Sequence, residues 1–249
     1  MRTFGLIGYP LGHSWSAGYF AAKFEKEGIS DVRYVNFPLE HIALLPELLQ
    51  GDPTLAGLNV TIPYKEKVIP YLHALEGAAQ EIGAINCISV KRNHSGILLT
   101  GHNTDAMGFE QCIEGKVPLM DRTAMILGTG GAAKAAAWVL QKNGCKIIWV
   151  SRRPSDDKTV GYDAITRQML TECTLIINAT PLGMMPGVEG FPPIPYNWLE
   201  SKQYLFDMVY NPTQTVFLTK GAEMGCTTIN GLEMLHYQAE AAWSIWNRR

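Results

Sequence analysis

The chain has 249 residues, enough to bury a sizeable core in one large domain or in two domains of roughly 100–150 residues. Charged residues make up 18% of it and hydrophobic residues 47%, a composition that excludes a disordered chain. The net charge of −2, without a long basic run, argues against nucleic acid or an anionic membrane as the partner.

The N-terminal stretch MRTFGLIGYP lacks the apolar core of a secretory signal, and no window reaches the roughly 18 apolar residues of a membrane span. The five cysteines are odd in number and widely spaced, without a CxxC pair. We therefore expect reduced thiols and a cytoplasmic protein. The six histidines show no metal-ligand spacing, so we expect no metal site.

The first half of the chain alternates strand and helix patterns, which predicts an α/β unit. Strands are expected at residues 4–9, 32–37, 55–61, 85–91 and 97–101, the last two joined by a turn at 93–96. Helices are expected at residues 17–27, 40–49, 65–72 and 76–82.

A helix at residues 105–114 leads into a second α/β unit. Its strands are expected at residues 124–127, 146–150, 174–178, 204–207 and, more weakly, 227–229. The segment 186–195 holds four prolines and two glycines and is typical of a loop. A final amphipathic helix is expected at residues 232–246, with Leu235, Ala239, Ala242 and Trp246 on one face.

The stretch MILGTGGAA has the pattern of a dinucleotide-binding turn between a buried strand and a helix. Gly128 permits the tight turn, Gly130 lets the backbone approach a pyrophosphate, and Ala133 is small enough for the helix to pack on the strand. The next helix opens with free N–H groups that favour phosphate. A glycine-rich helix entry without a ligand is the alternative, but the flanking strands favour the βαβ interpretation.

Polar residues interrupt the apolar pattern of the first unit mostly where strands end. They are Ser14, Ser16, Asn59, Thr61, Lys65, Asn86, Asn103, Thr104 and Asp105. Taken singly, Ser14 and Asp105 could be helix caps and Lys65 a solvated side chain. Because ligands of open α/β sheets bind outside the carboxyl ends of strands, the set together indicates a cleft for a small polyhydroxylated acid. A lysine near an aspartate can supply the proton that a ketone needs when hydride is transferred to it.

Two other patterns carry less weight. Tyr19 and Lys23 have the Y-x-x-x-K spacing of short-chain dehydrogenases, but they precede the glycine turn by over a hundred residues. One turn of a half-buried helix is the simpler interpretation. The serines of GHSWS do not stand in a G-x-S-x-G elbow, so a serine hydrolase is not favoured.

Eight motifs, in order along nearly the whole chain, resemble the shikimate dehydrogenase family. They are GYPLGHSWS, NVTIPYKE, IGAINCI, GHNTDAMGF, LGTGGAAKA, INATPLGM, FDMVYNPTQT and GLEMLHYQAEAAW. The resemblance implies reduction of 3-dehydroshikimate to shikimate with NADPH, in aromatic amino-acid biosynthesis. The departures are Ala17 where the family usually has proline, the absent His-Asn pair of the next helix turn, His236 where an apolar residue is common, and a shorter basic cluster at residues 151–154. Those in the helices concern packing and do not argue against the reaction.

The resemblance implies a role for each site residue. Lys65 and Asp105 would be the catalytic pair, and the substrate would bind Ser14, Ser16, Asn59, Thr61, Asn86 and Gln238, with Asp105 also contacting it. The cofactor would bind Gly128, Gly130, Gly131, Ala132, Ser151, Arg152, Arg153, Thr180, Met208, Tyr210 and Gly231. Ser151, Arg152 and Arg153 end the second cofactor strand, where an acidic residue would favour NAD, so NADP is expected.

The implied fold is two α/β domains. Residues 1–103 with 232–249 would form the substrate domain, and residues 104–231 a Rossmann-type NADP-binding domain, the last helix returning to the first domain. A quinate/shikimate dehydrogenase of broader substrate and cofactor range, able to take NAD, is a second hypothesis. A cofactor-binding regulator without catalysis is a third, disfavoured because Lys65 and Asp105 are present. The partner would be a small-molecule substrate, and the protein a monomer or homodimer.

Overall fold

The computed structural model describes residues 1–11, 14–94, 96–154 and 156–248. Gly12 and His13 of the GHSWS loop and Ser95 of the expected turn lie outside the described residues. The chain forms two compact units, Met1–Thr104 with Ala239–Arg249 and Asp105–Gln238. Both are α/β, as the alternation of sequence patterns predicts.

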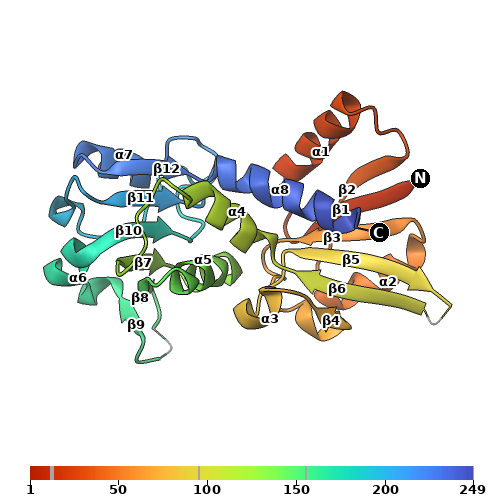
Figure 1. Cartoon of the computed structure of the whole chain (residues 1–249), viewed down its shortest axis with the longest axis horizontal. Coiled ribbons are helices and arrows are strands. Elements are labelled where there is room, and N and C mark those ends of the chain that lie inside the picture. Colours follow the sequence, from red (N-terminus) through yellow and green to blue (C-terminus); the bar gives the residue numbers. More distant parts are fainter. Residues whose placement is uncertain (12–13, 95, 155, 249) are drawn as a thin grey trace. The chain divides into compact units, whose positions relative to one another are not determined.

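The first unit is built on a mixed six-stranded sheet of order β2-β1-β3-β5-β6-β4 (Figure 1). Its strands are β1 (Arg2–Gly8), β2 (Val32–Pro38), β3 (Leu55–Val60), β4 (Ala74–Leu75), β5 (Cys87–Asn93) and β6 (Gly96–His102). The first three run parallel, while β5 pairs antiparallel with β3 and with β6. The start of β5 therefore lies beside the carboxyl end of β3, where the sequence places several polar residues.

Helices of the first unit are α1 (Trp15–Lys26), α2 (Leu45–Gly51) after a short 3-10 helix η1 (Ile42–Leu44), and α3 (Ala79–Ile82). The expected helix at 65–72 is wrong: turns lead to a short 3-10 helix η2 (Ile69–Tyr71), because Pro70 can stand at the start of a helix but has no N–H to continue one from the preceding residues. The expected helix at 76–82 is shorter, since Gly77 has a left-handed φ of 58° before it.

Two apolar clusters cover the two faces of this sheet. Phe4, Phe20, Cys87, Ala242 and Trp246 belong to the cluster that packs α1 and the end of α8 (Leu232–Trp246) on one face. The other face carries an aliphatic cluster from β1, β3, β5 and β6 with α2. Both faces are therefore buried, as the β-rich hydrophobic runs of this half predict.

The second unit is built on six parallel strands of order β12-β11-β10-β7-β8-β9 (Figure 1). They are β7 (Thr123–Leu127), β8 (Lys146–Ser151), β9 (Thr159–Gly161), β10 (Cys173–Asn178), β11 (Tyr204–Asp207) and β12 (Thr227–Asn230). Read from β9, this is the 3-2-1-4-5-6 order of the Rossmann fold. The chain reverses its direction of sheet growth between β7 and β10, so a ligand crevice is expected at their carboxyl ends.

Helices α4 (Thr104–Ile113), α5 (Gly131–Lys142), α6 (Arg167–Glu172) and α7 (Val216–Glu223) complete this unit with the first half of α8. The sequence patterns did not predict β9, α6 or α7, which are short. The connection between β8 and β9 is short, residues 152–158. Neighbouring parallel strands are usually joined by a crossover of a dozen residues or more that contains a helix.

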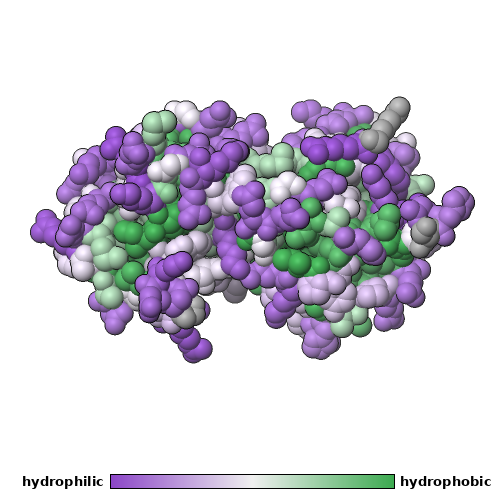
Figure 2. Space-filling model, turned by 60° about the horizontal axis from the view of Figure 1, so that its bottom comes forward, coloured by the Kyte–Doolittle hydropathy of each residue, from purple (hydrophilic) through white to green (hydrophobic). Residues whose placement is uncertain are grey.

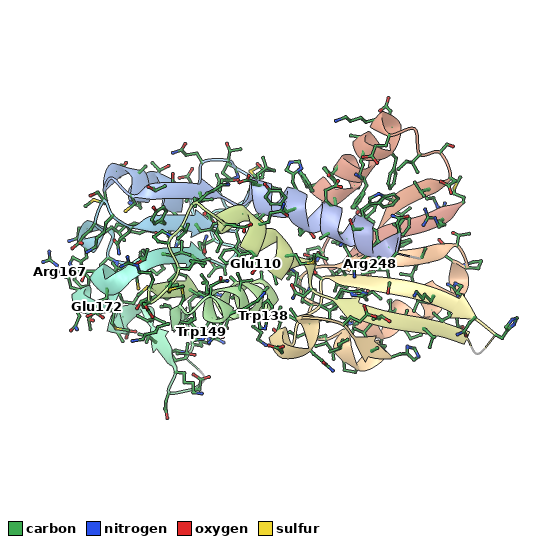
Figure 3. The ribbon with its side chains drawn as sticks, viewed as in Figure 1. Glu110, Trp138, Trp149, Arg167, Glu172 and Arg248 are labelled. Atoms are coloured by element: carbon green, nitrogen blue, oxygen red, sulfur yellow. The ribbon has the colours of Figure 1, made fainter. Side chains whose placement is uncertain are left out.

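Helices α4 and α8 approach each other at Gly108, where an added Cβ would lie 2.6 Å from the carbonyl oxygen of Met234. At the far end of α4, Glu110 lies 3.5 Å from Lys142 Nζ of α5, and that ammonium lies 5.1 Å from the Trp138 ring centre. Figure 3 labels Glu110 on α4 and Trp138 on α5. No helix within the described ranges combines the length and the apolar character that crossing a membrane requires.

Candidate active site

Asn59, at the end of β3, is held from two sides in the first unit. The Tyr34 hydroxyl donates to its Oδ1 at 2.8 Å, and its own Nδ2 donates to the carbonyl oxygen of Asn86 at 3.2 Å. Burial raises the pKa of Tyr34, and a hydrogen bond with the Ser16 side chain opposes that rise. Ser16 of α1, Tyr34 of β2 and Asn59 of β3 therefore form one chain of polar groups.

Asn86 fastens the start of α4. Its Nδ2 donates to Thr104 Oγ1 at 2.9 Å, and its Oδ1 accepts from Thr104 N at 2.6 Å. Asn103 Nδ2 donates to the carbonyl oxygen of Ala84 at 2.8 Å. Asp105, only 7% exposed, comes next in the chain, inside the first turn of α4. It does not occupy the position before the helix, so the expectation of a simple helix cap does not describe it.

Lys65 follows β3 in a turn and is half-buried. Its carbonyl oxygen accepts from Ile85 N at 2.7 Å, and Thr61 N donates to the carbonyl oxygen of Ile7 at 2.9 Å. These backbone bonds place Thr61 and Lys65 beside the ends of β1 and β3 and the start of β5. Within the first unit, Asn59, Thr61, Lys65 and Asn86 thus lie at one edge of the sheet.

Ser14 directly precedes α1 but makes no capping bond with its side chain. Its Oγ is buried and has no hydrogen-bond partner among the described residues. A buried hydroxyl without a partner is unfavourable by about 1–3 kcal/mol, so a bound polar group would stabilise this position. The capping alternative for Ser14 is therefore not supported.

The glycine turn of the second unit has the predicted strand–turn–helix form. Gly128 adopts φ 109°, a left-handed conformation, and its N–H donates to the carbonyl oxygen of Val150 at 2.8 Å. An added Cβ there would lie 3.1 Å from the carbonyl oxygen of Ala179 on the neighbouring loop. Gly130 immediately precedes α5, and a Cβ there would meet nothing within 4 Å. The turn therefore leaves open space beside the free N–H groups of α5.

Ser151 ends β8, and its hydroxyl bonds the backbone of Arg153, whose N–H lies 3.2 Å from Ser151 Oγ. Arg152 and Arg153 are exposed. Asp156 Oδ1 accepts from Lys158 N and from the Thr159 hydroxyl, so this carboxylate closes its own loop. Both guanidinium groups follow the strand at the place where a Rossmann fold reads the ribose of its cofactor.

A buried polar network that the sequence patterns did not single out lies at the ends of β10 and β11. Asp207 accepts hydrogen bonds from Asn178 Nδ2, Thr215 Oγ1 and Val209 N, and Asn178 Oδ1 accepts from Thr180 N and Oγ1. The signal was available, because Asn178 and Asp207 each end a run of apolar residues, as in LIIN and YLFD.

The remaining predicted cofactor and substrate residues occupy nearby loops and α8. Met208 N donates to the carbonyl oxygen of Asn178 at 3.0 Å, and burial raises the pKa of Tyr210. Gly231 is buried against the backbone at Asp207 and Met208. Gln238 is 8% exposed, and its Nε2 donates to the carbonyl oxygen of Leu235 at 3.1 Å.

Tyr19 and Lys23 of α1 both bond Glu240 of α8. The Tyr19 hydroxyl donates to one carboxylate oxygen, and Lys23 Nζ lies 2.9 Å from the other. Lys23 also pairs with Glu27 at 2.7 Å. The two side chains thus link α1 to the end of α8 through Glu240, in line with a structural interpretation of the Y-x-x-x-K pattern.

Two surface hollows are lined by other residues. One of about 620 Å³ lies against α4 and α5 near Met107 and Val139, and one of about 180 Å³ lies near Leu49 and His73 in the first unit. Figure 2 shows hydrophobic residues, in green, at the surface of each unit. The described ranges contain no group of three or more His, Cys, Asp or Glu residues that could hold a metal ion.

Residues 6–88 match the family model of the shikimate dehydrogenase substrate binding domain. The shikimate dehydrogenase (NADP(+)) of Halothermothrix orenii is 38% identical over 271 aligned positions, which cover 98% of this chain and 90% of that protein.

Solved structures of shikimate dehydrogenases have the same fold as this chain. Shikimate dehydrogenase 1 from Peptoclostridium difficile superposes with a TM-score of 0.86 at 34% identity, covering 99% of this chain and 91% of that one. The Thermus thermophilus enzyme, solved in complex with NADP(H) and shikimate, gives a TM-score of 0.85 at 29% identity, with coverages of 99% and 94%. A relative above 30% identity over almost the full length of both chains, with the same fold, places this chain in the shikimate dehydrogenase family.

Proposed function

We propose that this protein catalyses the NADPH-dependent, reversible reduction of 3-dehydroshikimate to shikimate, a step of chorismate and aromatic amino-acid biosynthesis. The observation that carries the proposal is the pairing, on one chain of this family, of a polar sheet edge with an open glycine turn. The edge offers Asn59, Thr61, Lys65 and Asn86, and the turn offers the unobstructed N–H groups of α5.

The proposed division of labour follows the expected domains. Residues 1–103 with 232–249 would bind the substrate, and residues 104–231 would bind NADP. The mixed sheet of the first part has hydroxyl and amide side chains suited to a polyhydroxylated acid. The parallel sheet of the second part has the strand order and the turn of a dinucleotide site.

Lys65 and Asp105 are the proposed catalytic residues. When bound, the reduced nicotinamide supplies hydride to the carbonyl carbon, and the carbonyl oxygen then needs a proton. Lys65 Nζ is the proposed donor in reduction and the proposed acceptor in the reverse reaction. The negative charge of Asp105 would favour the charged form of the lysine and orient it.

The proposed substrate contacts are with groups that can donate or accept hydrogen bonds. Ser14 and Ser16, at the N-terminal end of α1, suit a carboxylate because helix N–H groups and hydroxyls both donate. The other proposed contacts are Asn59, Thr61, Asn86, Asp105 and Gln238. The buried hydroxyl of Ser14 supports this role, because a bound oxygen would supply its missing partner.

The proposed NADP contacts combine backbone and charge. The turn around Gly128, Gly130, Gly131 and Ala132 would hold the pyrophosphate. Ser151, Arg152 and Arg153 would bind the 2′-phosphate of the adenosine ribose. The loops carrying Thr180, Met208, Tyr210 and Gly231 would enclose the nicotinamide half.

We further propose that the protein is cytoplasmic and acts as a monomer or homodimer on a small-molecule substrate. A quinate/shikimate dehydrogenase using NAD is the alternative enzyme. It is less well supported, because the strand β8 ends in Ser151 and Arg152 where an acidic residue would favour NAD. A catalytically silent regulator would not need Lys65 and Asp105.

The test is the absorbance at 340 nm with purified protein, shikimate and NADP⁺. We expect the band of the reduced nicotinamide to appear, and to appear more slowly with NAD⁺ or with quinate. No absorbance change with shikimate under any cofactor would exclude the proposed activity. Greater kcat/KM with quinate and NAD⁺ would favour the alternative enzyme.

A double-mutant cycle tests the catalytic pair. If Lys65 and Asp105 act as one unit, the Lys65→Ala, Asp105→Ala double variant should be little slower than the slower single variant. Full additivity of the two effects on log kcat would show that they act independently.

A further inference from the structure

The second unit contains a carboxylate with no exposed surface. Asp207 ends β11, and its Oδ1 accepts from Asn178 Nδ2 and from Val209 N, both at 2.9 Å. Its Oδ2 accepts from the Thr215 hydroxyl at 2.6 Å. All three partners donate to the carboxylate, so the arrangement fits the ionised form.

These donors come from three separate segments. Asn178 ends β10, Val209 lies in the loop after β11, and Thr215 is the residue before α7, whose Oγ1 also accepts from Leu218 N at 3.3 Å. Asn178 extends the network to Thr180, because its Oδ1 accepts from Thr180 N at 3.1 Å and from Thr180 Oγ1 at 2.6 Å. One carboxylate thus ties two loops and a helix start at the ligand edge of the sheet.

The segments linked by these hydrogen bonds, residues 179–182 and 208–215, carry proposed cofactor contacts. Thr180 is bonded directly by Asn178, and Met208 N donates to the Asn178 carbonyl oxygen at 3.0 Å. At Gly231 an added Cβ would lie 2.8 Å from the carbonyl oxygens of both Asp207 and Met208. The backbone at Gly231 is therefore packed closely against the backbone of Asp207 and Met208.

We propose that Asp207 is a positioning residue for the dinucleotide: through Asn178 and Thr215 it holds the 179–182 and 208–215 loops in the conformation that binds the nicotinamide half. The inference rests on the proposed role of this unit as the cofactor domain. Asp207 itself would touch no ligand, because it is enclosed by its own hydrogen-bond partners.

The charge at Asp207 is retained in spite of its burial. Burial raises the pKa of Asp207 to about 6, against the opposing effect of the hydrogen bonds from Thr215, Val209 and Asn178. Among the described residues, the titratable group that faces it is Tyr196 of the 3-10 helix η4 (Tyr196–Trp198), and the positive charge of Lys220 on α7 lies 5.5 Å from the centre of that ring. Burial raises the pKa of Tyr196, so this phenol stays neutral where Asp207 titrates.

Protonation of Asp207 would disturb the network. A protonated oxygen must itself donate, and the partner able to accept is the Thr215 hydroxyl, which would then turn its own proton away from the carboxylate. The hydrogen bond from the residue before α7 would be reversed and the charge-assisted bonds to Asn178 and Val209 would weaken. Cofactor affinity should therefore fall as the pH falls through the titration of Asp207.

The first experiment compares wild type with Asp207→Asn, which preserves the shape and removes the charge. We expect the Kd for NADP⁺, measured by calorimetry in the absence of shikimate, and the KM for NADP⁺ each to rise about ten-fold, because the charge-assisted hydrogen bonds to the carboxylate are weakened. The KM for shikimate and the kcat should stay within about two-fold. The control is Glu223→Gln, which removes an exposed charge from α7 and should leave both KM values unchanged.

The pH profile provides a reading that a general structural defect would not give. Between pH 7 and pH 5 the KM for NADP⁺ of the wild type should rise more steeply than that of Asp207→Asn. The 2′-phosphate of the cofactor titrates in the same range, with a pKa near 6 for a phosphomonoester. Because it is present in both measurements, the difference between the two profiles isolates Asp207.

A second pair of variants keeps the test valid if Asp207→Asn folds poorly. Thr215→Val removes the hydroxyl that donates to Asp207 and should raise the KM for NADP⁺. Thr215→Ser retains a hydroxyl and should keep the KM for NADP⁺ close to the wild-type value. Equal rises in the KM for NADP⁺ and for shikimate, or unchanged values in both Asp207→Asn and Thr215→Val, would overturn the positioning role. Loss of all shikimate oxidation by the wild type would instead overturn the proposed function.

Discussion

At the edge of the first sheet where β1 and β3 end, the chemistry depends on individual side chains. Most of the polar atoms there already have hydrogen-bond partners, so few remain for a ligand. Asn59, Asn86 and Asn103 are buried amides held by backbone carbonyls or by neighbouring side chains. Rigid amides of this kind present fixed donors to a ligand with little loss of conformational entropy. Ser14 differs, since its buried hydroxyl has no partner among the described residues.

The first prediction concerns Lys65. Lys65→Ala should lower kcat by roughly 10²–10⁴-fold, the range expected on removal of a general acid, while the KM for NADP⁺ stays close to that of the wild type. Steady-state kinetics with shikimate and NADP⁺ measures both. The matched control is Lys67→Ala, two residues away and exposed, which should retain the wild-type kcat. A wild-type kcat in Lys65→Ala would remove this residue from the mechanism.

At the scale of elements, Trp246 makes close contacts that hold the end of α8 on the first sheet. Trp246 Nε1 donates to the carbonyl oxygen of Ile88 at 3.0 Å, and its ring stacks on Phe4 with centres 4.8 Å apart. The ring fits because β3 has no side chain at Gly57. A Cβ there would lie 2.3 Å from Trp246 Nε1.

Gly57→Ala should therefore destabilise the first unit by about 1–3 kcal/mol, the usual effect of overpacking a core. Thermal unfolding followed by tryptophan fluorescence measures it, because Trp246 must move. Gly51→Ala is the control: a Cβ at Gly51, in the last turn of α2, meets nothing within 4 Å. An unchanged Tm in Gly57→Ala would mean that the ring adjusts at no cost.

The elements that the sequence predicted well are those with long, regular patterns. Strands β7 and β8 consist largely of continuous apolar runs, and α8 keeps an apolar face over four turns, so the sequence patterns of these elements were clear. The 65–72 segment misled because its apolar spacing suited a helix while Pro70 blocked one. Short elements such as β9 and α6 depend on packing against the sheet, which no local pattern reports.

For the candidate site, motifs found the residues that follow strand ends but not those that support them. The sequence shows that Asn178 and Asp207 each end an apolar run, but their hydrogen bonding with each other and with Thr215 is recognisable only when two strand ends and a helix start are brought together in space. A buried aspartate resembles any turn residue in a sequence, since burial and partners are properties of the fold. The assigned roles of Lys65, Asp105 and the other site residues stay predictions for the experiments above.

At the scale of the whole molecule, Asp207 makes stability depend on pH. The folded-state pKa of about 6 lies above the usual 3.8, so its contribution to stability is complete below about pH 4 and is lost as the pH rises through 6. A hydrogen bond with Lys116 lowers the pKa of Glu233. Burial raises the pKa of Asp52, but hydrogen bonds with Thr54 and Thr3 and the charge of Arg33 together lower it by more, so its pKa is also lowered. Their contributions have the opposite sign and are lost as the pH falls.

Asp207→Asn should isolate the first of these effects. The free energy of unfolding of the variant, relative to wild type, should increase by about 3 kcal/mol between pH 4 and pH 7, the value that corresponds to a shift of about two pKa units. Urea denaturation at several pH values measures it, and the contributions of Glu233 and Asp52 cancel in the difference. A constant difference across this range would mean that Asp207 does not titrate there. Higher stability with weaker NADP⁺ binding would show a carboxylate retained for function at the expense of stability.

Cofactor choice also belongs to the whole molecule, because it decides which cellular pool of reductant the enzyme uses. Strand β8 delivers Ser151, Arg152 and Arg153 to the ligand edge of the second sheet, and the carboxylate of Asp156 is engaged within its own loop. The strand ends without the acidic group that would repel a 2′-phosphate, and two exposed guanidinium groups can bind it in a forked geometry.

Replacing both Arg152 and Arg153 by alanine should raise the KM for NADP⁺ ten-fold or more, since charge-assisted hydrogen bonds contribute about 1.5–3 kcal/mol each. The KM for NAD⁺, which lacks the 2′-phosphate, should hardly change, so the preference for NADP⁺ should shrink by about the same factor. Raised salt should weaken NADP⁺ binding in the wild type more than in the variant, because exposed charges are screened. Arg167→Ala is the control, an exposed arginine on α6, labelled in Figure 3. Equal loss of affinity for both cofactors would mean that the arginines support the loop instead of binding the phosphate, and a wild-type preference for NAD⁺ would contradict the NADP assignment itself.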